Sequence, residues 1–399
     1  MSSAPPETDN WYKIERRGAT VLTESIPFPV ELISRPGQLT TAARELSAFQ
    51  VIAVDTESNS FYHYPEQLCL IQIASHHKVY LIDTIALDDL APLKDILENV
   101  SIKKIIHAAD NDIRGLDRHC GLHIRNLFDT SIAARIAGIT RLGLSALTND
   151  LLGITIDKSK RLQRADWGRR PLSAEAIKYA ATDVIHLFDL MEILNQRLRE
   201  LGRTAWVAEE CARIEEIRYT APDIEYAYLS VKESGNLDER GLAILRSLYT
   251  FREEEARHQH RPPFFILSDT ALVFLAGNPE ANFSEVPGFG QTGLNRLGKG
   301  LKKALYNGLN APPINRPHTG KYVRITSEHL QRLSLLKEWR TSLAFSLSLD
   351  PSLLWPLTSL EQLARAPNTL NSELASNNIR HWQRDVIAAS LRDYLDSIQ

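Results

Sequence analysis

The chain has 399 residues and a formal net charge of −3, and 43% of its residues are hydrophobic. This composition is that of a soluble globular protein with roughly two or three domains, and the near-neutral charge excludes a chain-wide attraction to nucleic acid. The three cysteines are too few and too far apart for a disulfide framework or a zinc motif. No stretch has the length and apolar character of a membrane span or a signal peptide, so we expect a cytoplasmic protein without a membrane partner.

Residues 1–26 form a polar tail, and residues 27–215 have the pattern of an α/β domain. Short apolar runs predict strands, and the first three follow one another closely enough for an antiparallel meander. Amphipathic runs between the later strands predict helices, which is typical of an α/β domain with a mixed sheet. The expected strands are 51–57, 68–74, 79–82, 103–107 and 127–129, and the expected helices are 38–48, 88–98, 111–119, 131–137, 145–152 and 173–199.

The first strand of this meander ends in two acids, Asp55 and Glu57. Residues two apart on a strand point to the same face, so we expect these carboxylates to lie side by side. Their like charges repel unless a cation lies between them, and hard oxygen ligands suit Mg²⁺ or Mn²⁺. An isolated pair of this kind is more often a solvated strand end, so its meaning depends on the rest of the chain.

Basic residues crowd around a single tryptophan between residues 157 and 170. Cations beside an aromatic ring suit phosphate contact combined with base stacking, although a solvated loop has the same composition. In the helix that follows, Tyr179 and Asp183 are four residues apart and share one face. The small residues between them would let a ligand approach closely, but an ordinary helix surface has the same pattern.

Beyond residue 215 the sequence changes to a helical pattern that occurs twice. A first unit at 234–311 and a second at 321–399 each contain an apolar helix, a loop with proline and a second helix, and a Pro-rich linker separates the units. We expect two small helical domains with these bounds. Gly288–Gly293 has the spacing G-x-G-x-x-G, but no strand precedes it, so it predicts no dinucleotide site.

Four acids on three segments can be combined into one site: Asp55, Glu57, Asp112 and Asp183. Four carboxylates are what a two-metal phosphoryl-transfer site needs, in which two cations about 4 Å apart clamp the attacking water and the leaving oxygen. Tyr179 could then hydrogen-bond that water. Because a phenol with a pKa near 10 is a poor base, we expect Tyr179 to orient the water instead of deprotonating it.

These motifs resemble those of ribonuclease D, a family of the DEDD exonuclease superfamily in its tyrosine subclass. The matching stretches are Asp55-Thr-Glu57, His107-Ala-x-x-x-Asp112, Asp166-Trp-x-x-Arg-Pro-Leu172, Tyr179-x-x-x-Asp183 and the strand Leu68-Cys-Leu-Ile-Gln-Ile73. Asp110 is a competing acid in the second of these motifs, but Asp112 has the family's spacing from His107. The helical units resemble HRDC domains, which are nucleic-acid-binding modules.

The resemblance implies a ribonuclease H-like α/β exonuclease domain with a mixed sheet, followed by two small all-α HRDC-like domains. It implies a 3′–5′ exoribonuclease that uses two divalent cations, releases nucleoside 5′-monophosphates and trims structured RNA such as tRNA precursors. In that interpretation the four acids hold the metals and Tyr179 is the fifth catalytic residue. The expected substrate contacts are His107, Lys158, Lys160, Trp167 and Arg170.

Two alternatives stay open. The first is a DNA exonuclease of the same superfamily, because the choice of RNA depends on contacts to the 2′-hydroxyl that motifs do not specify. The second is a catalytically silent RNA-binding protein on the same scaffold, although the presence of all four acids and the tyrosine argues against it.

Overall fold

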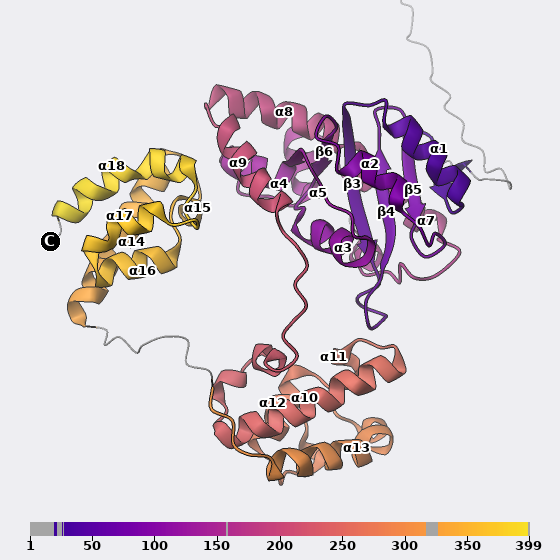
Figure 1. Cartoon of the computed structure of the whole chain (residues 1–399), viewed down its shortest axis with the longest axis vertical. Coiled ribbons are helices and arrows are strands. Elements are labelled where there is room, and N and C mark those ends of the chain that lie inside the picture. The colour runs from indigo at the N-terminus through magenta and orange to yellow at the C-terminus, as the bar shows by residue number, and fades with distance from the viewer. Residues whose placement is uncertain (1–19, 22–25, 27, 157–158, 317–325, 398–399) are drawn as a thin grey trace, which may run out of the picture.

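A computed structural model describes residues 20–21, 26, 28–156, 159–316 and 326–397. Three bodies are visible in Figure 1, an α/β body and two helical units, and each has a hydrophobic core of its own. The α/β core extends from Ile26 to Cys211, the first helical core from Tyr228 to Leu305, and the second from Leu336 to Leu395. Within this described part, none of the helices combines the length and apolar character that crossing a bilayer requires.

The α/β body is built on a seven-stranded sheet with the order β1-β2-β5-β4-β3-β6-β7. Neighbouring strands β3, β4 and β5 are antiparallel, which confirms the predicted meander, whereas β2–β5, β3–β6 and β6–β7 are parallel pairs. The predicted mixed sheet is therefore confirmed. The strands are β1 (Thr20–Val21), β2 (Val30–Ile33), β3 (Val51–Ser58), β4 (Leu68–Ala74), β5 (Val79–Asp83), β6 (Lys103–Ile106) and β7 (Leu127–Asp129).

Helices cover this sheet because its central strands are apolar on both faces. All residues of β4 and β5 are buried, and α7 packs on β3, β4 and β5. The helices of this body are α1 (Pro36–Leu46), α2 (Lys94–Leu97), α3 (Asp110–Cys120), α4 (Thr130–Ile136), α5 (Leu144–Leu147), α6 (Lys160–Gln163), α7 (Ala174–Ile185), α8 (Leu187–Glu200) and α9 (Thr204–Glu215).

The helix expected at 145–152 is α5 continued by a π-helical turn at Thr148–Leu152, and two other predicted helices differ more from those observed. The single helix expected at 173–199 is divided after Ile185, so that α7 lies on the sheet while α8 packs against α4. The helix expected at 88–98 is only α2, preceded by a short 3₁₀ turn at Ala91–Leu93. In both cases the amphipathic pattern is continuous in sequence, and tertiary contacts with different partners decide where the helix ends.

The two helical units share a long helix, two short helices and a long closing helix, and the second unit has α17 in addition. The four-residue helices α11 and α15 both begin with proline, and α12 and α16 both have nine residues. The helices of the first unit are α10 (Glu239–Gln259), α11 (Pro263–Ile266), α12 (Asp269–Gly277) and α13 (Gln291–Asn310). Those of the second are α14 (Ser327–Ser346), α15 (Pro351–Leu354), α16 (Leu357–Arg365), α17 (Leu370–Ala375) and α18 (His381–Ser397).

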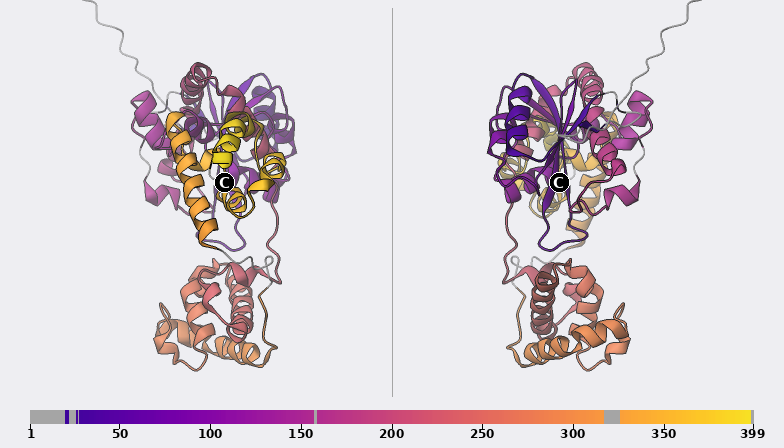
Figure 2. Two further views of the ribbon diagram at one scale, coloured as in Figure 1. Left: turned by 90° about the vertical axis from the view of Figure 1, so that its left-hand side faces the viewer. Right: turned by 90° about the vertical axis from the view of Figure 1, so that its right-hand side faces the viewer.

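The units attach to the α/β body at different places. Figure 2 shows the second unit lying against the side of the α/β body, with the first unit below. The second unit docks on α9, where the rings of Trp206 and Trp382 stack with centroids 4.6 Å apart. The first unit contacts the loop after β3. In that contact the Tyr64 hydroxyl donates a hydrogen bond to the Glu253 carboxylate on α10.

Candidate active site

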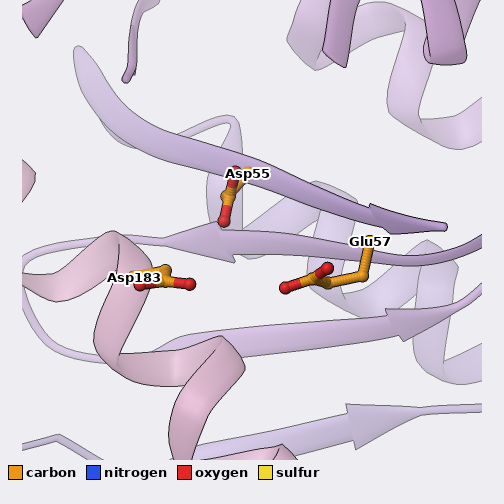
Figure 3. A group of neighbouring side chains, drawn as sticks. All are labelled: Asp55, Glu57 and Asp183. Carbon is orange, nitrogen blue, oxygen red and sulfur yellow. The ribbon is translucent and has the colours of Figure 1, made fainter. Parts of the chain in front are cut away.

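Three carboxylates converge at the end of β3. Asp55 and Glu57 come from β3 and Asp183 comes from α7, and one oxygen of each lies within 4.8 Å of the others. In Figure 3 the three side chains point toward one another. The site is open on one side because β3 pairs with β6 only over Val51–Ala53, whereas its pairing with β4 continues to Ser58.

The Tyr179 side chain lies one helical turn before Asp183 and hydrogen-bonds its carboxylate. Its ring also packs on Trp167, with the centroids 6.0 Å apart. Burial, followed by the negative charges of Asp183 and Glu57, raises the pKa of the Tyr179 phenol above its usual value. The hydroxyl therefore keeps its proton near neutral pH, and it can donate a hydrogen bond but is not a base.

Asp112 lies beside this group without being one of its three members. It is 7% exposed, and its Oδ1 accepts a hydrogen bond of 2.6 Å from the hydroxyl of Thr56, the residue between the two β3 acids. Burial raises the pKa of the Asp112 carboxyl to about 7, while the hydrogen bond from Thr56 opposes that increase. The competing acid Asp110 points outward and forms an exposed ion pair with Arg114, so Asp112 is the acid of this helix turn that contacts β3.

His107 also faces the carboxylates. It lines a cavity of about 220 Å³ together with Asp55, Glu57, Tyr179 and Asp183. Its Nδ1 is 2.9 Å from the hydroxyl of Thr130, which fixes the orientation of the ring.

The loop after His107 is held by an acid that the sequence analysis does not identify. The buried Asp129 accepts hydrogen bonds from the backbone amides of Ala108 and Ala109, at 3.1 and 2.8 Å, and also caps α4. Ala108 has a φ of 58°, which a residue with a side chain rarely adopts. An Asp followed by Thr-Ser before an apolar run is an N-cap signal, which could have pointed to this residue.

Two of the expected substrate contacts have structural roles. Trp167 is 1% exposed and packs in the core against Tyr179, so its faces are not available for base stacking. The Arg170 guanidinium forms two hydrogen bonds to the Asp83 carboxylate, at 2.6 and 2.7 Å, and another to the carbonyl of Cys69. Trp167 packs on α7, and the partners of Arg170 lie 87 and 101 residues away, in β5 and β4.

The remaining expected contacts lie around the short helix α6. Lys160 begins that helix and is exposed, whereas Lys158 lies outside the described residues. Gln163, at the other end of α6, lines the cavity of the carboxylates and was not expected from the sequence. The basic segment therefore borders the carboxylate cavity through Gln163, and Trp167 does not line that cavity.

Comparisons with known proteins agree with this geometry. The model of the 3′-5′ exonuclease family matches residues 30–199, and the HRDC domain model matches residues 241–305. Ribonuclease D of Granulibacter bethesdensis is 30% identical over 367 residues, which cover 90% of this chain and 91% of that protein. The chain belongs to the ribonuclease D family.

Two further members of the ribonuclease D family are informative. Ribonuclease D of Gluconacetobacter diazotrophicus is 34% identical over 258 residues, an alignment that covers 64% of this chain and 65% of that relative's length. The crystal structure of Escherichia coli RNase D, described as an exoribonuclease involved in structured RNA processing, superimposes with a TM-score of 0.71 at 25% identity. It covers 92% of this chain and 99% of that one. The predicted fold is confirmed, and the predicted 3′-5′ exoribonuclease class is confirmed at the level of the family.

The residues present fit the divalent-metal dependence of this ribonuclease D family. Three carboxylates within 4.8 Å form a hard oxygen donor set, and at that spacing their charges repel strongly unless a cation neutralises them.

Proposed function

We propose that the chain removes nucleotides one at a time from the 3′ end of RNA and releases nucleoside 5′-monophosphates. Asp55, Glu57, Asp112 and Asp183 would hold two divalent cations, Mg²⁺ or Mn²⁺. The observation that carries this proposal is the convergence of three carboxylates from two separate elements on one small cavity. Its size and acidic lining suit a single phosphodiester with its cations, not a large apolar ligand.

Tyr179 and His107, which lie beside the carboxylates, would orient the attacking water and contact the substrate. Two divalent cations at such a site stabilise the attacking and leaving oxygens of phosphodiester hydrolysis. The Tyr179 hydroxyl, whose proton goes to Asp183, would accept a hydrogen bond from the attacking water and thereby fix its orientation, and its raised pKa prevents it from acting as a base. His107, held by Thr130, would contact the substrate from the opposite side of the cavity.

The preferred substrate would be structured RNA such as a tRNA precursor. Support comes from the helical half, where α13 carries four exposed cations and no acid, which gives a local basic surface on a chain that is negative overall. These cations are Arg296, Lys299, Lys302 and Lys303.

We also propose that the chain is divided into a tail (1–26), an exonuclease domain (27–215) and two HRDC-like domains (234–311 and 321–399), and that it acts in the cytoplasm. The three free cysteines support a reducing compartment.

The test uses one RNA oligomer labelled at the 3′ end in one sample and at the 5′ end in another, digested with Mg²⁺. We expect the 3′ label to appear at once as mononucleotide and the 5′ label to give a ladder that shortens by single nucleotides. A matched DNA oligomer separates the RNA enzyme from a DNA exonuclease, and Asp183→Asn is the inactive control. Binding of RNA without any cleavage by the wild-type protein would favour the catalytically silent alternative.

A further inference from the structure

We propose that the loop after β3 and the basic segment around α6 together form an RNA subsite. In this subsite Phe61, Tyr62 and Arg164 hold unpaired bases that lie upstream of the scissile bond. The inference rests on the proposed function, because it names the part of the RNA that is held outside the catalytic cavity. It assigns base stacking to residues other than Trp167, which is buried.

The loop is built to hold two aromatic side chains in the open. Asn59 closes its base, since its Oδ1 accepts a hydrogen bond of 2.8 Å from the backbone amide of Gln67 and its carbonyl accepts one of 2.8 Å from that of Tyr62. Further along, Tyr64 is tied to Glu253 of the first helical unit. Between these anchors Phe61 and Tyr62 are each 45% exposed, which is unusual for two adjacent large aromatic residues without a partner chain.

The basic segment packs directly on this loop. A Cβ added at Gly168 would lie 2.9 Å from the side-chain nitrogen of Asn59, so a larger residue here would displace the side chain that closes the loop. The Arg164 guanidinium then lies 5.7 Å from the centroid of the Phe61 ring. An arginine beside an exposed aromatic ring offers a base both a stacking face and a positive charge.

The charge of the neighbourhood suits a polyanion. Tyr62, Arg161 and Arg169 line one cavity of about 690 Å³. The exposed cations here are Lys160, Arg161, Arg164 and Arg169, and the acids that face them are Asp166 and Glu175, of which Glu175 pairs with Arg161. Four cations against two acids leave a net positive surface beside the aromatic pair, which is complementary to the phosphates that flank stacked bases.

Helix α6 connects this subsite with the catalytic cavity. Gln163 lines the cavity of the carboxylates, and Arg161 lines a neighbouring cavity of about 530 Å³ together with Tyr179 and Asp183. A strand whose 3′ end lies at the acids therefore passes α6, and its upstream nucleotides come to Phe61 and Tyr62. Neither ring lines the cavity of the carboxylates, so we expect a dinucleotide bound there not to contact them.

The experiment compares Phe61→Ala, Phe61→Leu and Arg164→Gln with wild type on a dinucleotide and on a single-stranded RNA of about twelve nucleotides. Phe345→Ala, which removes an 87% exposed aromatic residue from α14, is the matched control. Loss of one base–aromatic stack is expected to raise KM for the longer RNA about 5-fold or more. Phe61→Leu should show most of this loss, since it keeps apolar bulk but no π face, and the dinucleotide should be cleaved at the wild-type rate by all variants.

A second arm measures binding of the longer RNA in the Asp183→Asn background, so that the subsite is tested even if the wild-type protein cleaves no RNA. Weaker binding of the Phe61 variants in that background would support the subsite. This result does not depend on whether the wild-type protein hydrolyses RNA. Unchanged KM and binding for the longer RNA, or an equal loss on the dinucleotide, would overturn the proposal. Melting temperatures equal to wild type exclude misfolding as the cause.

Discussion

Replacement of Asp112 by asparagine should stabilise the metal-free protein at neutral and alkaline pH. Asparagine has the same shape and keeps the oxygen that accepts the Thr56 hydrogen bond, so the change removes only the buried negative charge. Burial raises the pKa of this carboxyl from 3.8 to about 7, and the charge of Asp129 adds to the increase.

The raised pKa of Asp112 sets both the sign and the size of the difference in free energy of unfolding between the variant and the wild-type protein. Because the folded state binds the proton more tightly than the unfolded chain, the wild-type protein loses stability as the pH rises from about 4 to about 7. The asparagine variant does not, so its advantage is absent near pH 4 and complete above pH 7. A difference of about three pKa units at about 1.4 kcal/mol each sets a limit of about 4 kcal/mol. Hydrolysis should nevertheless be lost, since a proposed metal ligand is gone.

Urea titration in EDTA at several values between pH 4.5 and pH 8, followed by circular dichroism, measures this difference. Asp110→Asn is the control, because that acid is half exposed in its ion pair with Arg114 and its loss should change stability little at any pH. A variant of Asp112 that is destabilised to the same extent at every pH would show that the folded protein favours the charged carboxylate, and would refute the reasoning.

Three further outcomes are expected. Asp55→Asn or Asp183→Asn should abolish hydrolysis while the circular dichroism spectrum stays that of the folded protein, and wild-type turnover by either purified variant would remove that residue from the site. Tyr179→Phe keeps the ring packing, so RNA affinity measured by fluorescence anisotropy should be unchanged while the rate falls about 10²-fold or more, and a normal rate would make the tyrosine a packing residue only. Trp382→Ala should destabilise the second helical unit by about 3–5 kcal/mol in a denaturant titration without slowing cleavage of a short oligomer, and an equal loss on every RNA would instead indicate that this unit supports the catalytic domain.

Asp55, Glu57 and Asp183 could be predicted as members of one site because the position of each within its strand or helix depends on local geometry. The period of two along β3 places Asp55 and Glu57 on one face, and the period of an α-helix places Tyr179 one turn before Asp183. Whether a side chain of the basic segment is buried depends instead on its tertiary contacts, and those of Arg170 come from the distant strands β4 and β5. Trp167 and Arg170 have the composition of an RNA contact, yet β5 and α7 enclose them, and the exposed rings come from a different loop.

The two helical units show a further limit of sequence patterns, since similar helices attach in different ways. At the start of α18, Arg380 forms two hydrogen bonds to Glu210 of α9, and the backbone amides of His381 and Trp382 donate to Glu209. The Trp382 indole also donates to Glu210. A helix terminus that is held by two acids of the α/β body is not available to a polyanion, and those acids would repel one.

The first unit is matched by the HRDC model, and it carries the basic face of α13. We therefore expect the contribution of the helical half to RNA affinity to come mainly from that face. The salt dependence of binding decides this: replacing two of the α13 lysines should make log Kd less steep in log salt by about two units, because about one counterion is released for each phosphate that a cation neutralises. Replacing cations on α18 should leave the slope unchanged, and a change in slope there would contradict the division of roles between the two units.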